Sequence, residues 1–193
     1  MTPKCVSILS DPHPCGHIVY PYTDEDHVAH AVALYASAGL KNGEAVILLM
    51  TQAHVGPIDH RLRAVGRLNT DHLQRTGQLT YAVAESMLPT FMVDGMPDER
   101  RFKAVFGEMI ERARSVVAAP QNNGLVRAFG EMVSLLWADS VEAAARVEAY
   151  WDDLIQQYSI SLLCTYALVD ARKSLPAVLV NCHSHNLGSP LLN

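Results

Sequence analysis

The feature that most limits the possible folds is a pair of nearly uninterrupted apolar runs, Ala45–Met50 and Ile160–Tyr166. A half-exposed strand alternates apolar and polar residues, whereas a continuous run is typical of a strand buried on both faces of a parallel sheet. Shorter runs predict four further strands: His17–Tyr22, Gln78–Val83, Leu125–Phe129 and Ala177–Val180. A mostly parallel sheet is therefore expected at the centre of the chain.

Segments with helical periodicity separate these strands. Thr23 is predicted to cap a helix that Gly39 ends in the left-handed conformation, and Thr51 and Ser140 are predicted to cap two later helices. A long helix with one apolar side is expected from Asp98 onward. Strands that alternate with helices predict right-handed crossovers and a three-layer α/β fold, in which helices cover both faces of the sheet.

One stretch, Glu85–Gly95, lacks a clear period, with Pro89 inside it and Pro97 shortly after it. Pro89 and Pro97 are expected to interrupt any long element there. The stretch is therefore predicted to be irregular, and to serve as a mobile lid or binding loop.

Length and charge exclude several classes of protein. A chain of 193 residues with 49% hydrophobic residues is sufficient for one domain with a sizeable core. The net charge is −5 and no basic run is present, so nucleic acid is not expected as a direct partner. No apolar stretch approaches the roughly 20 residues of a membrane span, and no leader is recognisable, so a cytoplasmic protein without membrane contact is expected. Four cysteines without a CxxC pair predict reduced thiols.

Candidate binding residues are those at which strands end, because ligands of open parallel sheets lie beyond the carboxyl ends of the strands. These residues are Tyr20, Tyr22, Glu131, Cys164 and Tyr166. Glu131 is the most informative, since a carboxylate that follows an apolar strand must be paired or hydrogen-bonded. The alternative is that Glu131 opens the next helix and interacts with its dipole. Cys164 is more typical of an inert buried thiol than of a nucleophile.

The turn after the first strand argues against a phosphate site. It reads Pro-Tyr-Thr-Asp-Glu-Asp over residues 21–26, without a glycine and with three carboxylates. The chain also lacks GxxxxGK[ST] and GxGxxG after this strand. A nucleotide-hydrolysing enzyme of the usual kind is therefore not expected.

Histidine and cysteine gather near both ends of the chain. The candidates for a transition metal are Cys15, His17, Cys182, His183 and His185, which carry the nitrogen and sulfur donors that zinc accepts. Their spacing matches no standard zinc module, and solvated side chains are the alternative. No cofactor is therefore predicted, and a metal is kept as the alternative.

Seven short segments carry a family resemblance by their order and spacing: His17–Tyr22, Ala38–Glu44, Thr76–Leu79, Arg127–Met132, Glu148–Trp151, Leu163–Tyr166 and Cys182–His185. Together they resemble the MEDS domain, a sensory domain of methanogens and methylotrophs. The resemblance spans residues 15–185 as a single domain and leaves an N-terminal tail, 1–14, and a C-terminal tail, 186–193. It implies a RecA/KaiC-like fold with a degenerate phosphate-binding loop, in agreement with the glycine-free turn.

The resemblance also implies a role in sensing small hydrocarbon derivatives. Such domains accompany histidine kinases, anti-sigma-type modules or DNA-binding domains, none of which is recognisable in this chain. A stand-alone sensor is therefore expected, which relays its signal to a separate protein such as a histidine kinase or transcription regulator. A homo-oligomer is compatible with this interpretation.

Two hypotheses from different classes follow. The first is a small-molecule-binding signalling module, whose pocket is formed by His17, Tyr20, Tyr22, Glu131, Cys164, Tyr166 and His183. The alternative is an enzyme, either a degenerate nucleotide-dependent one or a metal-assisted hydrolase with Glu131 as general base and the His and Cys residues as ligands. Because no recognisable motif pairs a nucleophile with a base, the first hypothesis is preferred and no enzyme is expected.

Overall fold

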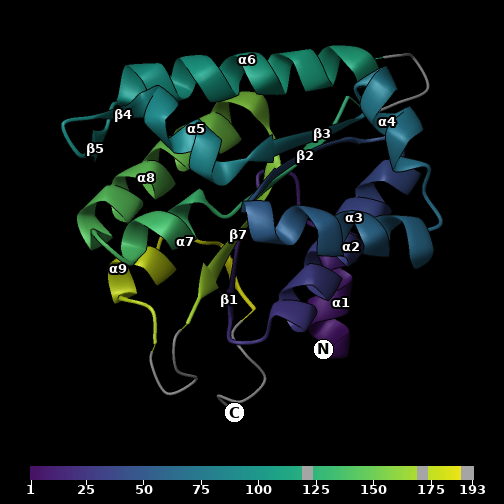
Figure 1. Ribbon diagram of the computed structural model, residues 1–193, viewed down its shortest axis with the longest axis horizontal. Helices are drawn as coiled ribbons and strands as arrows, with labels where there is room; N and C mark the ends of the chain where they lie inside the picture. Colours follow the sequence, from purple (N-terminus) through teal and green to yellow (C-terminus); the bar gives the residue numbers. More distant parts are fainter. Residues whose placement is uncertain (119–123, 169–173, 188–193) are drawn as a thin grey trace.

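The computed structural model describes residues 1–118, 124–168 and 174–187. Its centre is a six-stranded, all-parallel sheet in the order β3-β2-β6-β7-β1-β8 (Figure 1). The strands are β1 (His17–Tyr22), β2 (Ala45–Met50), β3 (Leu79–Val83), β6 (Val126–Gly130), β7 (Ser161–Ala167) and β8 (His185–Asn186). The predicted parallel sheet is confirmed, and the bounds of β1 and β2 are those expected from the sequence.

Helices cover both faces of this sheet, which confirms the three-layer α/β fold (Figure 1). One face carries α1 (Pro3–Ser10), α2 (Glu25–Lys41), α3 (Gln52–Ala64) and α4 (Thr70–Thr76). The other carries α5 (Ala84–Phe91), α6 (Glu99–Val117), α7 (Met132–Trp137), α8 (Val141–Tyr158) and α9 (Ala177–Val180). Across the described ranges, none of these helices combines the length and apolarity that a membrane span requires.

The stretch Glu85–Gly95, predicted to be irregular, is instead ordered as a helix and a hairpin. Helix α5 contains Pro89, and it leads into β4 (Met92–Val93), which pairs antiparallel with β5 (Met96–Pro97). Phe91 is fully buried, and its ring lies 5.0 Å from that of Phe102. Burial of this aromatic side chain outweighs the helix-breaking tendency of the proline, so the prediction of an irregular stretch was wrong.

The predicted last strand, Ala177–Val180, is the helix α9. Four consecutive apolar residues fit a buried strand and a buried helix equally well, and Pro176 starts a helix as readily as it precedes a strand. The sixth strand of the sheet is β8, which pairs with β1. At the other end, the residues expected to form an N-terminal tail contain α1, whose Leu9 is fully buried.

The predicted helix caps are correct in part. Ser140 accepts a hydrogen bond from the amide of Ala143, as expected of a cap. Helix α2 is capped by Asp24 rather than Thr23, and Oδ1 of Asp24 accepts from the amides of both Asp26 and His27. Thr51 lies at the N-cap of α3, but its side chain makes no capping bond.

Gly39 does not end α2 in the left-handed conformation, because the helix continues to Lys41 and the chain turns at Gly43, with φ of 77°. A Cβ atom at Gly39 would lie 2.8 Å from Cδ of Arg127. The glycine is therefore required for close packing of α2 against Arg127, and not for its backbone conformation.

Arg127 forms a buried ion pair with Glu44 near the amino ends of the strands. Its Nε donates to one oxygen of Glu44, and Nη2 donates to the other at 2.9 Å. Nη1 lies within hydrogen-bonding distance of the carbonyls of Leu9 and Ser10, both at 3.2 Å, and of Tyr35 at 3.3 Å. One guanidinium group thus joins β6 to α1, α2 and the start of β2.

We expect Arg127→Met to destabilise the protein by about 3–5 kcal/mol, because it leaves the Glu44 carboxylate buried without its charge partner. Urea unfolding followed by circular dichroism measures this loss. Arg112→Met is the matched control, since the Arg112 side chain is 76% exposed and its pair with Glu108 is a surface pair worth at most about 1 kcal/mol. Equal losses in the two variants would contradict the role given to Arg127.

Candidate functional site

The structure separates the predicted ligand residues into two groups, because neighbouring positions of a strand face opposite sides of the sheet. Four of them meet on the face covered by α8: His17, Cys164, Tyr166 and His183. The other three, Tyr20, Tyr22 and Glu131, contact residues of the opposite face. One pocket containing all seven residues is therefore not formed within the described parts of the chain.

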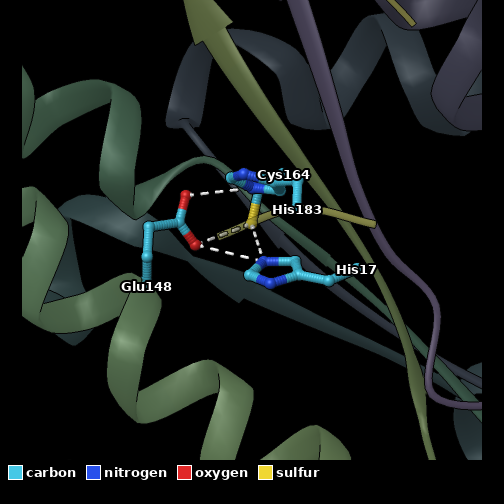
Figure 2. A group of neighbouring side chains, drawn as sticks. All are labelled: His17, Glu148, Cys164 and His183. Atoms are coloured by element: carbon cyan, nitrogen blue, oxygen red, sulfur yellow. Dashed lines mark hydrogen bonds and ion pairs between the residues drawn. The ribbon is translucent and has the colours of Figure 1, made fainter. Parts of the chain in front are cut away.

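The first group is completed by Glu148, and we call His17, Glu148, Cys164 and His183 the α8-face cluster. One potential ligand atom from each of these side chains lies within 4.8 Å of the other three. Figure 2 shows Glu148 reaching from α8 toward the two strand residues, with His183 closing the group. The four side chains come from segments that are far apart in sequence: β1, α8, β7 and the segment that joins α9 to β8.

Glu148 was not predicted as a ligand residue, although the sequence contains a signal for it. It is fully buried on the side of α8 that also carries Ala144, Trp151 and Ile155. These residues lie four positions before, three positions after and seven positions after Glu148, which is the spacing of one helix face. A carboxylate inside an apolar helix stripe must have partners in the core.

Short contacts connect the members of this cluster. Nε2 of His17 lies 3.2 Å from Oε2 of Glu148 and 3.5 Å from Sγ of Cys164. The Cys164 thiol donates to the same Glu148 oxygen at 3.4 Å. Nε2 of His183 lies 3.3 Å from Oε1 of Glu148. The carboxylate is therefore the centre of the group.

A second layer of polar groups holds these side chains in orientation. Nδ1 of His17 lies 2.7 Å from Oδ1 of Asp152, and the Tyr166 hydroxyl donates to Oε1 of Glu148. Sγ of Cys182 lies 3.2 Å from Nδ1 of His183. Three of the four side chains, His17, Glu148 and His183, are thus each held by a neighbour outside the cluster.

The charges of the cluster follow from its burial. Burial alone would lower the pKa of His17, but hydrogen bonds and charge interactions with Asp152 and Glu148 raise it to about 9. Burial would raise the pKa of Glu148, but its interactions with His17 and His183 hold it well below its usual range. Burial and the Glu148 charge raise the pKa of the Cys164 thiol. At neutral pH, this group therefore contains a carboxylate, an imidazolium and a protonated thiol.

The donor set of the cluster comprises two imidazole nitrogens, one carboxylate oxygen and one sulfur. Such a set can hold a transition-metal ion, bind a polar end of a small molecule, or exchange protons. Of the metal candidates predicted from sequence, His17 and His183 belong to it and Cys182 contacts it. Cys15 and His185 lie outside the group of four.

Glu131 belongs to a different polar group, which we call the α3-edge cluster: Glu131, Thr51, His54 and Glu25. Glu131 is fully buried and accepts hydrogen bonds from the Thr51 amide at 2.8 Å and from the Thr51 hydroxyl at 3.2 Å. It also lies 2.6 Å from Nδ1 of His54, whose Nε2 contacts Glu25. Although Glu131 occupies the N-cap position of α7, its side chain makes no capping bond there. It therefore pairs with α3 instead of capping its own helix.

Aromatic and acidic groups surround this second cluster. The Tyr22 ring lies 6.1 Å from the His54 ring, edge to face. The Asp24 carboxylate accepts from the amides of Asp26 at 2.8 Å and His27 at 3.0 Å, so the donors at the start of α2 are already in use.

At the opposite, amino edge of the sheet, a surface hollow bordered by residues that include Asn42 and Ser161 contains none of the predicted ligand residues.

The α3-edge cluster predicts a pH dependence of stability. The hydrogen bond to Glu131, acting against burial, raises the pKa of His54 from 6.5 to about 9. A raised pKa stabilises the fold fully below about pH 6.5, and this contribution is lost as the pH rises through about 9. The free energy of unfolding of the wild type, measured relative to that of His54→Gln, should therefore fall by on the order of 2–3 kcal/mol between about pH 6 and pH 9.5. Urea unfolding at both pH values tests this, and a pH-independent difference would contradict the assignment.

No curated protein matches the chain. The family model described as "MEDS: MEthanogen/methylotroph, DcmR Sensory domain" matches residues 16–184. This range includes both clusters and every strand of the central sheet except β8, which begins at the next residue. The sequence resemblance is thereby confirmed. The chain belongs to the MEDS family of sensory domains.

Proposed function

We propose that this chain senses a small molecule of low polarity, such as a hydrocarbon derivative, and relays its binding to a separate regulatory protein. Membership of a sensory family supports the general role. The observation that carries the proposal is the α8-face cluster, a concentrated polar group inside an otherwise apolar layer. Apolar walls with a few convergent polar groups are typical of small-molecule sites.

The walls of the site support a ligand of low polarity. The buried residues of this layer include Val19 and Leu162 on the strands and Leu179 on α9. Trp137 stands edge-on to Tyr166, with ring centroids 6.2 Å apart. A small apolar group can pack against such surfaces, while a polar end meets the histidines, the thiol or the carboxylate.

The position of His183 suggests how binding is relayed. His183 precedes Ser184, whose amide donates to the carbonyl of His17 at 2.7 Å and whose hydroxyl accepts from the amide of His17 at 3.0 Å. The amide of Leu187 donates to the carbonyl of Val19 at 2.9 Å. A ligand that moves His183 therefore acts directly on the segment that forms the edge of the sheet. We propose that a histidine kinase or transcription regulator, or a second copy of the chain, reads this edge.

Binding fits the chemistry of the site better than turnover does. The raised pKa of Cys164 keeps the thiol protonated, which makes it a poor nucleophile. Glu131, the general base of the enzyme hypothesis, is already bonded to Thr51 and His54. We also propose a RecA/KaiC-type origin without nucleotide binding, because Asp24 occupies amides at the start of α2 that a phosphate would need.

Nuclear magnetic resonance can test this assignment with methanol, dimethyl ether and chloromethane as probes. We expect at least one of them to shift the amide signals of His17, Cys164 and His183 in a saturable manner, and to shift those of β8 with them. His183→Gln should weaken this response by about tenfold or more, because it removes one group that positions the ligand.

His54→Gln is the matched control, because it changes a buried histidine of the other cluster. We expect it to leave the response of the α8-face cluster unchanged. Saturable shifts confined to Tyr22 and Glu131 would move the site to the α3-edge cluster. The absence of any saturable shift with the three probes would contradict sensing of such compounds.

A further inference from the structure

We propose that His17, Glu148, Cys164 and His183 together bind one transition-metal ion, with Zn²⁺ as the preferred ion. The proposal rests on the assignment of the α8-face cluster as the binding site, and it adds the cofactor through which that site acts. It uses Cys164 and Glu148, neither of which was among the metal candidates predicted from sequence.

The distances between the ligand atoms fit tetrahedral zinc. Zinc bonds of about 2.0 Å to nitrogen or oxygen and about 2.3 Å to sulfur place neighbouring ligand atoms roughly 3.3–3.5 Å apart. Oε2 of Glu148 lies 3.2 Å from His17 and 3.4 Å from Cys164, and these two ligand atoms are 3.5 Å apart. His183 lies 3.3 Å from the other carboxylate oxygen, Oε1, and the four ligand atoms lie within 4.8 Å of one another. Three ligand atoms therefore already have tetrahedral spacing, and His183 must move toward them to complete the site.

An unpartnered buried nitrogen points to a missing ligand. The His183 side chain has no exposed surface, and its Nε2 atom makes no hydrogen bond within the described residues. This atom lies 3.3 Å from Oε1 of Glu148, an oxygen that already accepts from Tyr166. A buried polar atom without a partner is costly, and a metal ion would satisfy it.

Outer hydrogen bonds orient the ligands as metal sites require. The Nδ1 atom of His17 faces Asp152, so its Nε2 atom is directed into the cluster (Figure 2). A carboxylate that holds a histidine in this way is a common companion of zinc. Tyr166 fixes the Glu148 carboxylate from the other side.

A metal-free ion pair explains less of the arrangement. An imidazolium at His17 paired with Glu148 accounts for two of the four side chains. Cys164 can donate to the same carboxylate, but Nε2 of His183 is left without a hydrogen bond within the described residues. When Zn²⁺ binds, the Cys164 thiol proton and any proton on His17 Nε2 pass to solvent, and the sulfur and nitrogen lone pairs form bonds to the metal.

The choice of zinc follows from the mixed donor set. Two imidazoles, one carboxylate and one thiolate suit a borderline-soft ion with tetrahedral preference, whereas magnesium and calcium prefer oxygen ligands alone. With all four positions filled by protein, the ion would fasten the segment before β8 to α8 and β7. A small molecule that displaces one ligand would release that segment.

Metal content and cobalt spectroscopy test the proposal on the full chain, without any small molecule. Protein purified without chelator should contain about one zinc per chain by elemental analysis. After removal of the zinc, titration with Co²⁺ should give the visible bands of a tetrahedral site and a thiolate-to-cobalt charge-transfer band. Cys164→Ser should abolish that band, and Glu148→Gln should weaken Co²⁺ binding by on the order of a hundredfold.

Two further variants make the outcome decisive. Cys5→Ser changes a cysteine of α1 outside the cluster and should leave binding and spectrum unchanged. Asp152→Asn, at a side chain that is 42% exposed, should fold normally and weaken Co²⁺ binding by about 10–100-fold. This variant keeps the test valid if the buried substitutions fail to fold.

The proposal is overturned by a wild-type protein that gives no thiolate band, or by wild-type Co²⁺ affinity in Glu148→Gln or Asp152→Asn. These outcomes are independent of the sensing experiment. A chain that binds the metal but shows no response to the three small molecules would contradict the proposed function alone. A chain that responds to them without metal would contradict the metal site alone.

Discussion

The arrangement of the α8 face depends on the contacts that surround the buried carboxylate of Glu148. An ionised carboxylate in an apolar layer is very costly unless partners surround it. Glu148 obtains them from β1, from β7 and from the segment before β8, so one charge on one helix fixes the positions of three other segments. The ion pair of Arg127 and Glu44 acts in the same way near the amino ends of the strands. On each face of the sheet, a buried charged contact thus adds to the apolar packing.

The fold could be predicted where apolar runs are long and sharply bounded. The bounds of β1 and β2 agree with the sequence because turn residues or charges flank a continuous apolar run. Prediction failed where tertiary packing decides between local alternatives, as at Ala177–Val180 and in the proline-containing α5. There, burial of Leu179 and Phe91 selects the helix, and no local pattern carries that information.

Three of the four members of the α8-face cluster could be predicted from the sequence. His17 and His183 were noticed as donors and Cys164 as a strand residue, and the structure brings these three together. Glu148 and Asp152 are not among the predicted residues, because they lie on a helix and belong neither to the strand ends nor to the His and Cys groups near the chain ends. Alternation along β1 divides the predicted pocket residues, because it places His17 on the face opposite to Tyr20.

The register between β1 and β7 has a consequence for how the site can be lost. His17 stands opposite Leu162 and Val19 opposite Cys164, so the same pairing buries the core and assembles the polar group. A slip of one residue would turn Ile18 toward Glu148 and place His17 among the apolar side chains under α2. A misaligned strand would therefore destabilise the core and disrupt the α8-face cluster at the same time. Selection for a stable fold is therefore enough to preserve the alignment of the site. Relatives would then differ in what they detect mainly through substitutions of the ligand residues themselves.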